Sequence, residues 1–192
     1  MGLKILGTGV SPFVRKTRVV CIEKSLAYTL EQVSPFNPPP DWRKISPLGK
    51  IPALDHDGKI VNDSSVICAY LERIAPEPAL YPSDPYAYAR ALWIEEYADA
   101  GLFAVIAPKF FMPLALQPVL TGKPPEAPLI EAATKAMQEE VAPLFAYLEG
   151  QLGAKGFFVG GALANAMVIS GGRLPGGQFP THVDAEVDVF IG

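Results

Sequence analysis

Hydroxyl and carboxyl side chains stand at the expected starts of two helices, where they could contact a charged ligand. Ser11 precedes Pro12, and serine followed by proline is typical of a helix N-terminus. Asp63-Ser64-Ser65 precedes a second helical stretch in the same way. The free N–H groups at such a terminus attract a carboxylate, whereas an aspartate there can accept from an ammonium group. A plain helix cap is the alternative role for each.

The backbone at Ile51-Pro52 offers a different contact. Pro52 is predicted to begin a strand, and a proline there cannot donate a hydrogen bond to a neighbouring strand. The adjacent backbone is therefore free to pair with another extended segment.

Other site types fit the sequence less well. Gly7-Thr8-Gly9 lies between a strand and a helix, as a dinucleotide loop would, but Pro12 stands where the third glycine is needed. Cys21 and Cys68 form no CxxC pair, so we expect free buried thiols and no metal site. A net charge of −4 argues against a nucleic-acid partner. The apolar N-terminal run is too short to span a membrane, so we also expect no membrane partner.

Turn signals and apolar runs predict the order β-α-β then β-β-α in the first part of the chain. The expected elements are a strand at 3–7, a helix at 12–24, a strand at 26–33, strands at 52–55 and 59–61, and a helix beginning at 63–65. Asp57-Gly58 is typical of a tight hairpin between the last two strands. The proline-rich segment 34–50 is predicted to be a constrained loop.

The second part of the chain is predicted to be helical. A linker at 75–85 divides a first domain, 1–78, from a helical domain, 86–192. One long helix is marked by Ala89, Leu92, Trp93, Glu96, Tyr97 and Ala100. After a break at 121–128, a second carries an apolar stripe that we expect to pack inside the domain: Ile130, Thr134, Met137, Val141, Leu144 and Leu148. Pro143 should bend this helix.

The segment Ser-Pro-Leu-Gly-Lys-Ile-Pro-Ala-Leu at 46–54, followed by Asp-Gly and Asp63-Ser64, resembles the N-terminal half of the glutathione S-transferases. The segment at 11–16 does so too, and the resemblance runs from residue 1 to about residue 160. It implies an α/β plus all-α fold, in which a thioredoxin-like βαβ-ββα domain precedes a helical bundle. It also implies a cytoplasmic homodimer.

The resemblance assigns glutathione contacts to Lys50, Ile51, Pro52, Asp63, Ser64 and Asp99. Pro52 would be cis, and the backbone of Ile51 would bind the cysteinyl part as an added strand. Asp63 and Ser64 would hold the γ-glutamyl end. Lys50 would face the glycyl carboxylate. Asp99 would reach glutathione bound to the neighbouring subunit.

Ser11 is the predicted catalytic residue, because its hydroxyl at a helix N-terminus can donate to the glutathione sulfur. Lowering the thiol pKa by roughly two units corresponds to about 2.7 kcal/mol of thiolate stabilisation. In this resemblance, the pocket for the electrophile would be walled by Phe13, Phe103, Phe110 and Phe111. Core packing is the alternative role for these rings.

The resemblance therefore implies a transferase in detoxification that conjugates glutathione, its only expected cosubstrate, to a small hydrophobic electrophile. Glutathione-dependent peroxidase, dehalogenase or isomerase chemistry is the nearby alternative, and a non-catalytic binding or interaction protein of the same fold is the distant one. Residues 162–192 depart from the family pattern: Ala164 stands where relatives carry a helix cap, and Met167 where they carry aspartate. The identity of the electrophile does not follow from these residues.

Overall fold

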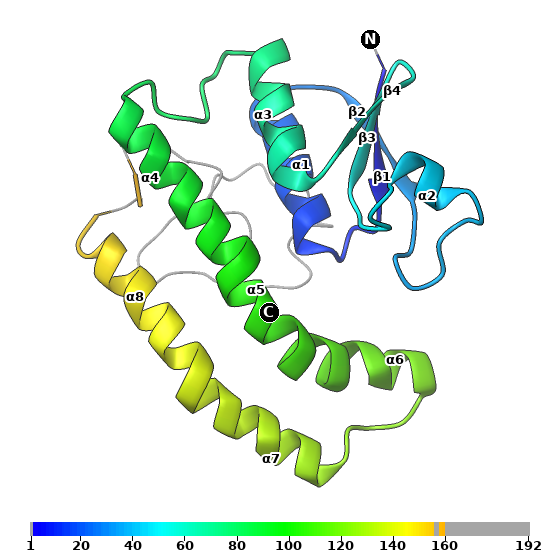
Figure 1. Cartoon of the computed structure of the whole chain (residues 1–192), viewed down its shortest axis with the longest axis vertical. Coiled ribbons are helices and arrows are strands. Elements are labelled where there is room, and N and C mark those ends of the chain that lie inside the picture. The colour runs from blue at the N-terminus through cyan, green and yellow to red at the C-terminus, as the bar shows by residue number, and fades with distance from the viewer. Residues whose placement is uncertain (1, 156–157, 160–192) are drawn as a thin grey trace.

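The computed structural model describes residues 2–155 and 158–159, and its first part is built on a four-stranded sheet (Figure 1). The strands are β1 (Leu3–Gly7), β2 (Tyr28–Gln32), β3 (Ala53–His56) and β4 (Lys59–Asn62), in the spatial order β2-β1-β3-β4. β1 and β2 are parallel, while β3 runs antiparallel to both β1 and β4. The predicted order of these elements along the chain and the hairpin between β3 and β4 are confirmed.

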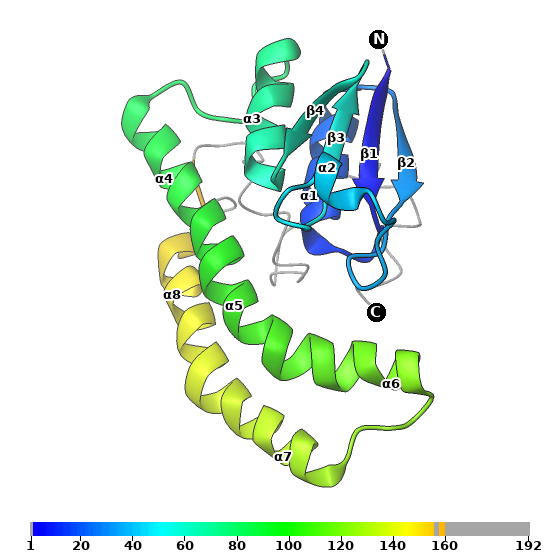
Figure 2. The ribbon, with the colours of Figure 1, turned by 45° about the vertical axis from the view of Figure 1, so that its right-hand side comes forward.

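Two helices cover one face of this sheet. α1 (Pro12–Glu23) and α3 (Ser64–Ile74) pack against each other, between the sheet and the helical part of the chain (Figure 2). Their buried apolar side chains, including Val14, Val20 and Leu71, join those of the strands in one core. Removing such side chains from water is the main force that holds this layer together.

One short helix was not predicted. α2 (Trp42–Ile45) lies in the connection between β2 and β3, which the prolines had indicated to be a loop. Trp42 anchors it, because the indole is only 2% exposed and belongs to the core of the first part. Apolar burial here outweighs the local preference of a proline-rich segment.

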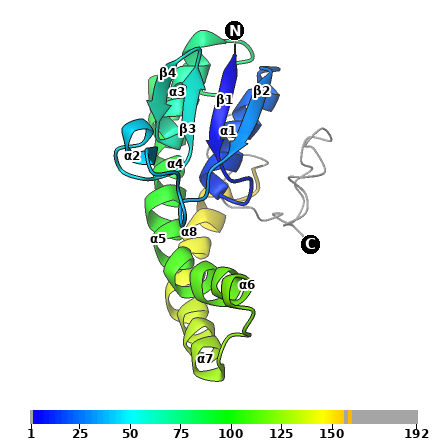
Figure 3. The same cartoon turned by 90° about the vertical axis from the view of Figure 1, so that its right-hand side faces the viewer.

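The second part is a pair of antiparallel helical arms that extend away from the sheet (Figures 1 and 3). The first arm comprises α4 (Pro85–Glu96), η1 (Tyr97–Leu102), α5 (Phe103–Ile106), η2 (Ala107–Leu116) and α6 (Gln117–Thr121). The returning arm comprises α7 (Ala127–Ala136), η3 (Met137–Val141) and α8 (Ala142–Leu152). The three η segments are π-helical. Pro113 lies inside η2 and Pro143 is the second residue of α8, just after η3 ends at Val141, as expected where a proline removes a helical N–H donor.

The predicted apolar stripe of the returning arm packs only in its second half. Leu148 is buried and Leu144 packs in the same cluster, but Ile130 and Met137 are each 47% exposed. Ala133 and Ala136 are buried in their place. The expectation that the whole stripe packs inside the domain is therefore wrong, because the π-helical turns of η3 rotate the face that follows them relative to the face before.

The connection between the two parts is fixed to the first part by side chains. Lys24 Nζ donates to the carbonyl oxygens of Ala75, at 2.7 Å, and Pro78, at 2.8 Å, and lies 2.6 Å from Glu72 Oε2. Leu80 packs into the core of the first part. The domain boundaries at 78 and 86 stay a prediction, and the atypical stretch 162–192 lies outside the described residues.

Among the described residues, the run Pro85–Leu116 is long and apolar enough to cross a membrane, by length and composition alone. Only 6% of its most apolar stretch is buried within the described structure. Its N-terminal half nevertheless carries two carboxylates, Glu95 and Asp99, that pair with a lysine of α1.

Candidate functional site

The sheet topology brings three predicted site segments to one edge. β1 ends at Gly7, just before Ser11, and its Leu6 lies opposite Ala53, just after Pro52. Ala53 in turn lies opposite Asn62, just before Asp63. The close approach is visible at Gly7, where an added Cβ atom would lie 3.4 Å from Ile51 Cβ. Residues distant in sequence therefore line one rim.

Ser11 occupies the N-cap position of α1 and Pro12 follows at the first helical position. Its backbone N–H donates to the carbonyl oxygen of Thr8 at 3.0 Å. Its half-buried hydroxyl makes no capping hydrogen bond. The hydroxyl is therefore not used to stabilise the helix start, which leaves its donor for a ligand.

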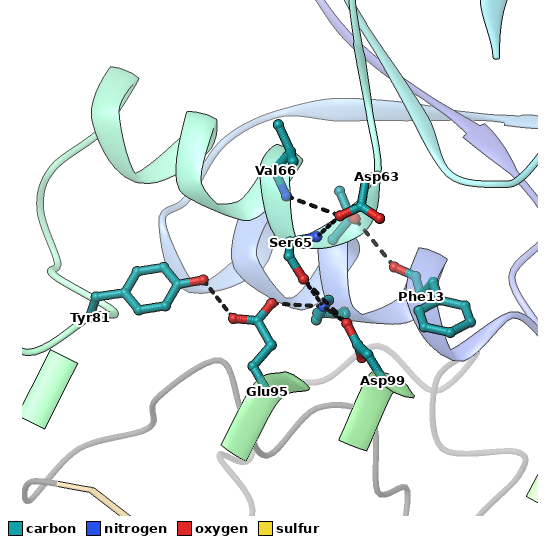
Figure 4. Close-up of polar contacts among 9 residues, drawn as sticks. Phe13, Asp63, Ser65, Val66, Tyr81, Glu95 and Asp99 are labelled. Carbon is teal, nitrogen blue, oxygen red and sulfur yellow. Dashed lines mark hydrogen bonds and ion pairs between the residues drawn. The ribbon is translucent and has the colours of Figure 1, made fainter. Parts of the chain in front are cut away.

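The N-terminus of α3 is closed by Asp63 rather than by a serine. Asp63 Oδ1 accepts from the backbone N–H of Ser65 at 2.9 Å and of Val66 at 3.3 Å (Figure 4). Asp63 has a φ of 74° and a ψ of 133°, a conformation outside the left-handed helical region that residues other than glycine rarely adopt. The buried Ser64 makes no hydrogen bond, by hydroxyl or by backbone N–H, to the described residues. The aspartate cap thus coexists with unused donors.

The peptide bond between Ile51 and Pro52 is cis, as the resemblance implied. Within the described residues, neither the N–H nor the C=O group of Ile51 makes a backbone hydrogen bond. An extended ligand could satisfy both groups, as an added strand would. The Lys50 side chain is exposed beside this segment.

A buried ion network, not foreseen from the sequence, lies directly beneath the start of α3. Lys16 is 0% exposed, and its Nζ lies 2.7 Å from Glu95 Oε1, 2.8 Å from Asp99 Oδ2 and 2.9 Å from Ser65 Oγ. Tyr81 donates its hydroxyl to Glu95 Oε2 at 3.0 Å (Figure 4). One ammonium group therefore joins α1, α3 and the helical arm.

The charges in this network act on one another strongly. Burial alone would lower the pKa of Lys16, but the attraction of Glu95 and Asp99 raises it above its ordinary value. Burial raises the pKa of Asp99, which Lys16 only partly offsets and to which repulsion from Glu95 adds. The network therefore favours the charged form of Lys16, whereas burial disfavours the charged form of Asp99.

Asp99 contacts its own chain. Ser65 Oγ donates to Asp99 Oδ2 at 3.2 Å, while Asp99 Oδ1 is buried and makes no hydrogen bond to the described residues. These distances place the carboxylate beside the α3 terminus of the same chain. The contact with glutathione of a neighbouring subunit stays a prediction.

The sequence did contain one signal for the network. Glu95 and Asp99 are four residues apart and so share a helix face. Buried carboxylates require a partner, and Lys16 on α1 supplies it.

Two of the four predicted pocket aromatics meet. The rings of Phe13, in α1, and Phe103, in α5, lie edge to face with centroids 4.6 Å apart. Phe110 and Phe111 lie farther along the arm in η2, half-buried, and no ring contact within the described residues joins them to Phe13. The geometry supports an apolar contact between the two parts of the chain at Phe13 and Phe103.

Both cysteines are free and buried, as expected. Burial raises the pKa of Cys21 to about 12 and raises that of Cys68 as well. Thiols in this state are poor nucleophiles, so neither supplies reactive sulfur.

Comparison with known proteins agrees with this arrangement. The profile described as glutathione S-transferase, N-terminal domain, matches residues 10–74. Glutathione S-transferase U4 of Arabidopsis thaliana is 30% identical over 174 residues, which are 90% of this chain and 70% of that protein. Protein LigF of a Sphingobium species is 40% identical over 106 residues, 50% of this chain but only 41% of that protein.

A solved glutathione S-transferase from Methylobacterium radiotolerans, in complex with glutathione sulfonate, superimposes with a TM-score of 0.69 and 26% identity. The match covers 89% of this chain and 76% of that one. The chain belongs to the glutathione S-transferase family, and its fold is the thioredoxin-like domain followed by a helical region that the resemblance implied.

Proposed function

We propose that this protein is a glutathione transferase that joins the glutathione thiolate to a small hydrophobic electrophile. The observation that carries the proposal is the Ser11 hydroxyl, which stands at the N-terminus of α1 and makes no capping hydrogen bond. The same rim carries Ile51 with unpaired backbone groups and the α3 terminus with unused donors.

The proposed binding mode assigns each part of glutathione to one segment of the rim. The γ-glutamyl carboxylate lies at the α3 N-terminus, against Ser64 and the helix dipole. Asp63 is the acceptor for the γ-glutamyl ammonium group, and Asp99 is proposed to reach glutathione bound to the neighbouring subunit. The cysteinyl backbone pairs with Ile51 before cis Pro52, and the exposed Lys50 faces the glycyl carboxylate.

The proposed chemistry is attack by a stabilised thiolate. Ser11 donates its hydroxyl hydrogen to the sulfur, and the positive end of α1 favours the negative charge. The sulfur then forms a bond to the electrophilic carbon as the leaving group departs or the activated double bond takes up the electron pair. The rings of Phe13 and Phe103 are the proposed apolar surface for such an electrophile, with Phe110 and Phe111 farther along the arm.

The test is a spectroscopic titration of the thiol of bound glutathione. In the wild type the thiol pKa should lie well below that of free glutathione, and Ser11→Ala should return it toward the free value. Ser83→Ala, an exposed serine between the two parts of the chain, is the matched control and should change nothing.

The alternative outcomes identify the rival functions. Binding of glutathione with no lowered thiol pKa would indicate a non-catalytic glutathione-binding protein, as the resemblance leaves open. Peroxidase, dehalogenase or isomerase activity without conjugation would retain the thiolate but change the electrophile. A role in detoxification, as a homodimer in the cytoplasm, belongs to the proposal. If light scattering gave the mass of a monomer at micromolar concentration, the proposal of a homodimer would be wrong.

A further inference from the structure

We propose that Lys16 is a positioning residue of the glutathione site, whose buried ammonium group fixes the N-terminus of α3 against the helical arm. This inference rests on the proposed function, because it concerns the terminus that holds the γ-glutamyl group. Lys16 does not itself contact the ligand in this account.

The first step is the contact between Lys16 and Ser65. Lys16 Nζ donates to Ser65 Oγ at 2.9 Å, and the backbone N–H of the same serine donates to Asp63 Oδ1 at 2.9 Å. A single residue therefore connects the buried ammonium to the aspartate cap. Movement of Ser65 would move the cap and the neighbouring Ser64 with it.

The second step is the attachment to the helical arm. Glu95, in α4, and Asp99, in η1, approach Lys16 Nζ from one side at 2.7 and 2.8 Å. Ser65 Oγ also donates to Asp99 Oδ2 at 3.2 Å, which closes a ring of three polar contacts around α3 (Figure 4). The arm thus holds the ligand-binding terminus from below.

The third step is that α1 carries both Ser11 and Lys16. Ser11 occupies the N-cap position without a capping hydrogen bond, and Lys16 lies in the second turn of the helix. The donor to the sulfur and the cation beneath the γ-glutamyl site are therefore fixed on one rigid element. A lysine that served stability alone would need no link to the start of α3.

Lys24 provides a matched control on the same helix. It is also a fully buried side chain paired with a carboxylate, Glu72 at 2.6 Å, but it lies at the far end of α1 and contacts the connection at Ala75 and Pro78. Lys16→Met and Lys24→Met therefore remove comparable buried charges, of which only one touches α3 near the rim.

The experiment measures glutathione affinity by calorimetry, the thiol pKa at saturating glutathione, and thermal stability. Lys16→Met should raise the dissociation constant about tenfold, the equivalent of roughly 1.4 kcal/mol, while the thiol pKa at saturation stays at the wild-type value. Lys16→Arg should restore most of the affinity, since it keeps the charge. Lys24→Met should lower the melting temperature and leave the affinity unchanged.

Ser65→Ala decides the question if Lys16→Met does not fold, because it removes only the hydroxyl between the ammonium and the cap. It should weaken glutathione binding in the same direction. Unchanged affinity in whichever of the two variants folds would overturn the positioning role and leave Lys16 a purely structural residue. Failure of the wild type to bind glutathione would instead overturn the proposed function, and the positioning role with it.

Discussion

The stability of the junction between the two parts should depend heavily on Lys16. Lys16→Met keeps the length of the side chain but leaves Glu95 and Asp99 without their cation. The side chain of Glu95 is 3% exposed and that of Asp99 16%, so water cannot replace the lost partner effectively. Removing one partner from a buried ion pair costs about 3–5 kcal/mol, and this is the expected loss in the free energy of unfolding.

The two carboxylates explain why the cost should lie in that range. With Lys16 gone, both acids keep hydroxyl donors, Tyr81 on Glu95 and Ser65 on Asp99, but within the described part of the chain no other cation pairs with them. Lys16→Met combined with Glu95→Gln removes one uncompensated charge and should recover a large part of the loss. A recovery of this kind would show that unpaired charge, and not lost packing, is the cause.

Urea denaturation followed by circular dichroism is the assay, with wild type, Lys16→Met, the double variant and Lys24→Met compared at neutral pH. In the control variant, Lys24 pairs with one carboxylate rather than two, so Lys24→Met should lower the free energy of unfolding by less than Lys16→Met does. A loss below about 1 kcal/mol for Lys16→Met would refute the reasoning, since values of that size are typical of exposed ion pairs.

Three further outcomes are expected. Because the pKa of Asp99 is raised, the folded state binds the proton of this carboxyl group more tightly than the unfolded state does. The contribution of Asp99 to stability therefore falls as the pH rises from the ordinary pKa of 3.8 through the raised pKa of the folded state. Asp99→Asn should remove this pH dependence of the free energy of unfolding, measured by urea titrations at stepped pH. Asp63→Ala should lower the free energy of unfolding by about 1 kcal/mol in urea denaturation, because the α3 cap is lost. Asp63→Asn should lower it less, since asparagine can also cap a helix. Equal losses in the two variants would argue against the capping role. Cys21, with its pKa raised to about 12, and Cys68 should react with a thiol reagent at pH 8 only after unfolding, and fast labelling of the native protein would contradict their burial.

Local signals in the sequence were sufficient for much of the first part of the fold. Alternating apolar runs and Asp57-Gly58 located the strands, and Ser11-Pro12 located a helix start to within a residue. The grouping of the site segments came from the family resemblance and not from local signals, and the strand pairing is what shows that their ends adjoin. Helix α2 could not be predicted, since it depends on burial of Trp42 by residues distant in sequence.

In the helical arms, the periodicity of apolar residues does not predict which helix face is buried. Leu92 and Trp93 belong to the pattern that marked the first arm, yet they are 39% and 46% exposed, while Ala91 and Ile94 are buried. Large apolar residues predict that a helix exists better than which of its faces is covered. The π-helical turns shift that face again, and no residue type marks them in advance.

The ion network escaped prediction for a related reason. A lysine in a helix with two arginines beside it, and two acids four residues apart, are compatible with ordinary solvated charges. Only the three-dimensional approach of α1, α3 and the arm shows that Lys16 is buried and shared by Glu95, Asp99 and Ser65.

The most direct test of the central claim is the thiol pKa of bound glutathione, measured by thiolate absorbance in the wild type and in Ser11→Ala at saturating glutathione. The account predicts a pKa lowered by roughly two units in the wild type, about 2.7 kcal/mol, and a return toward the free value in the variant. Equal thiol pKa values in the two proteins would contradict it and remove Ser11 from the mechanism.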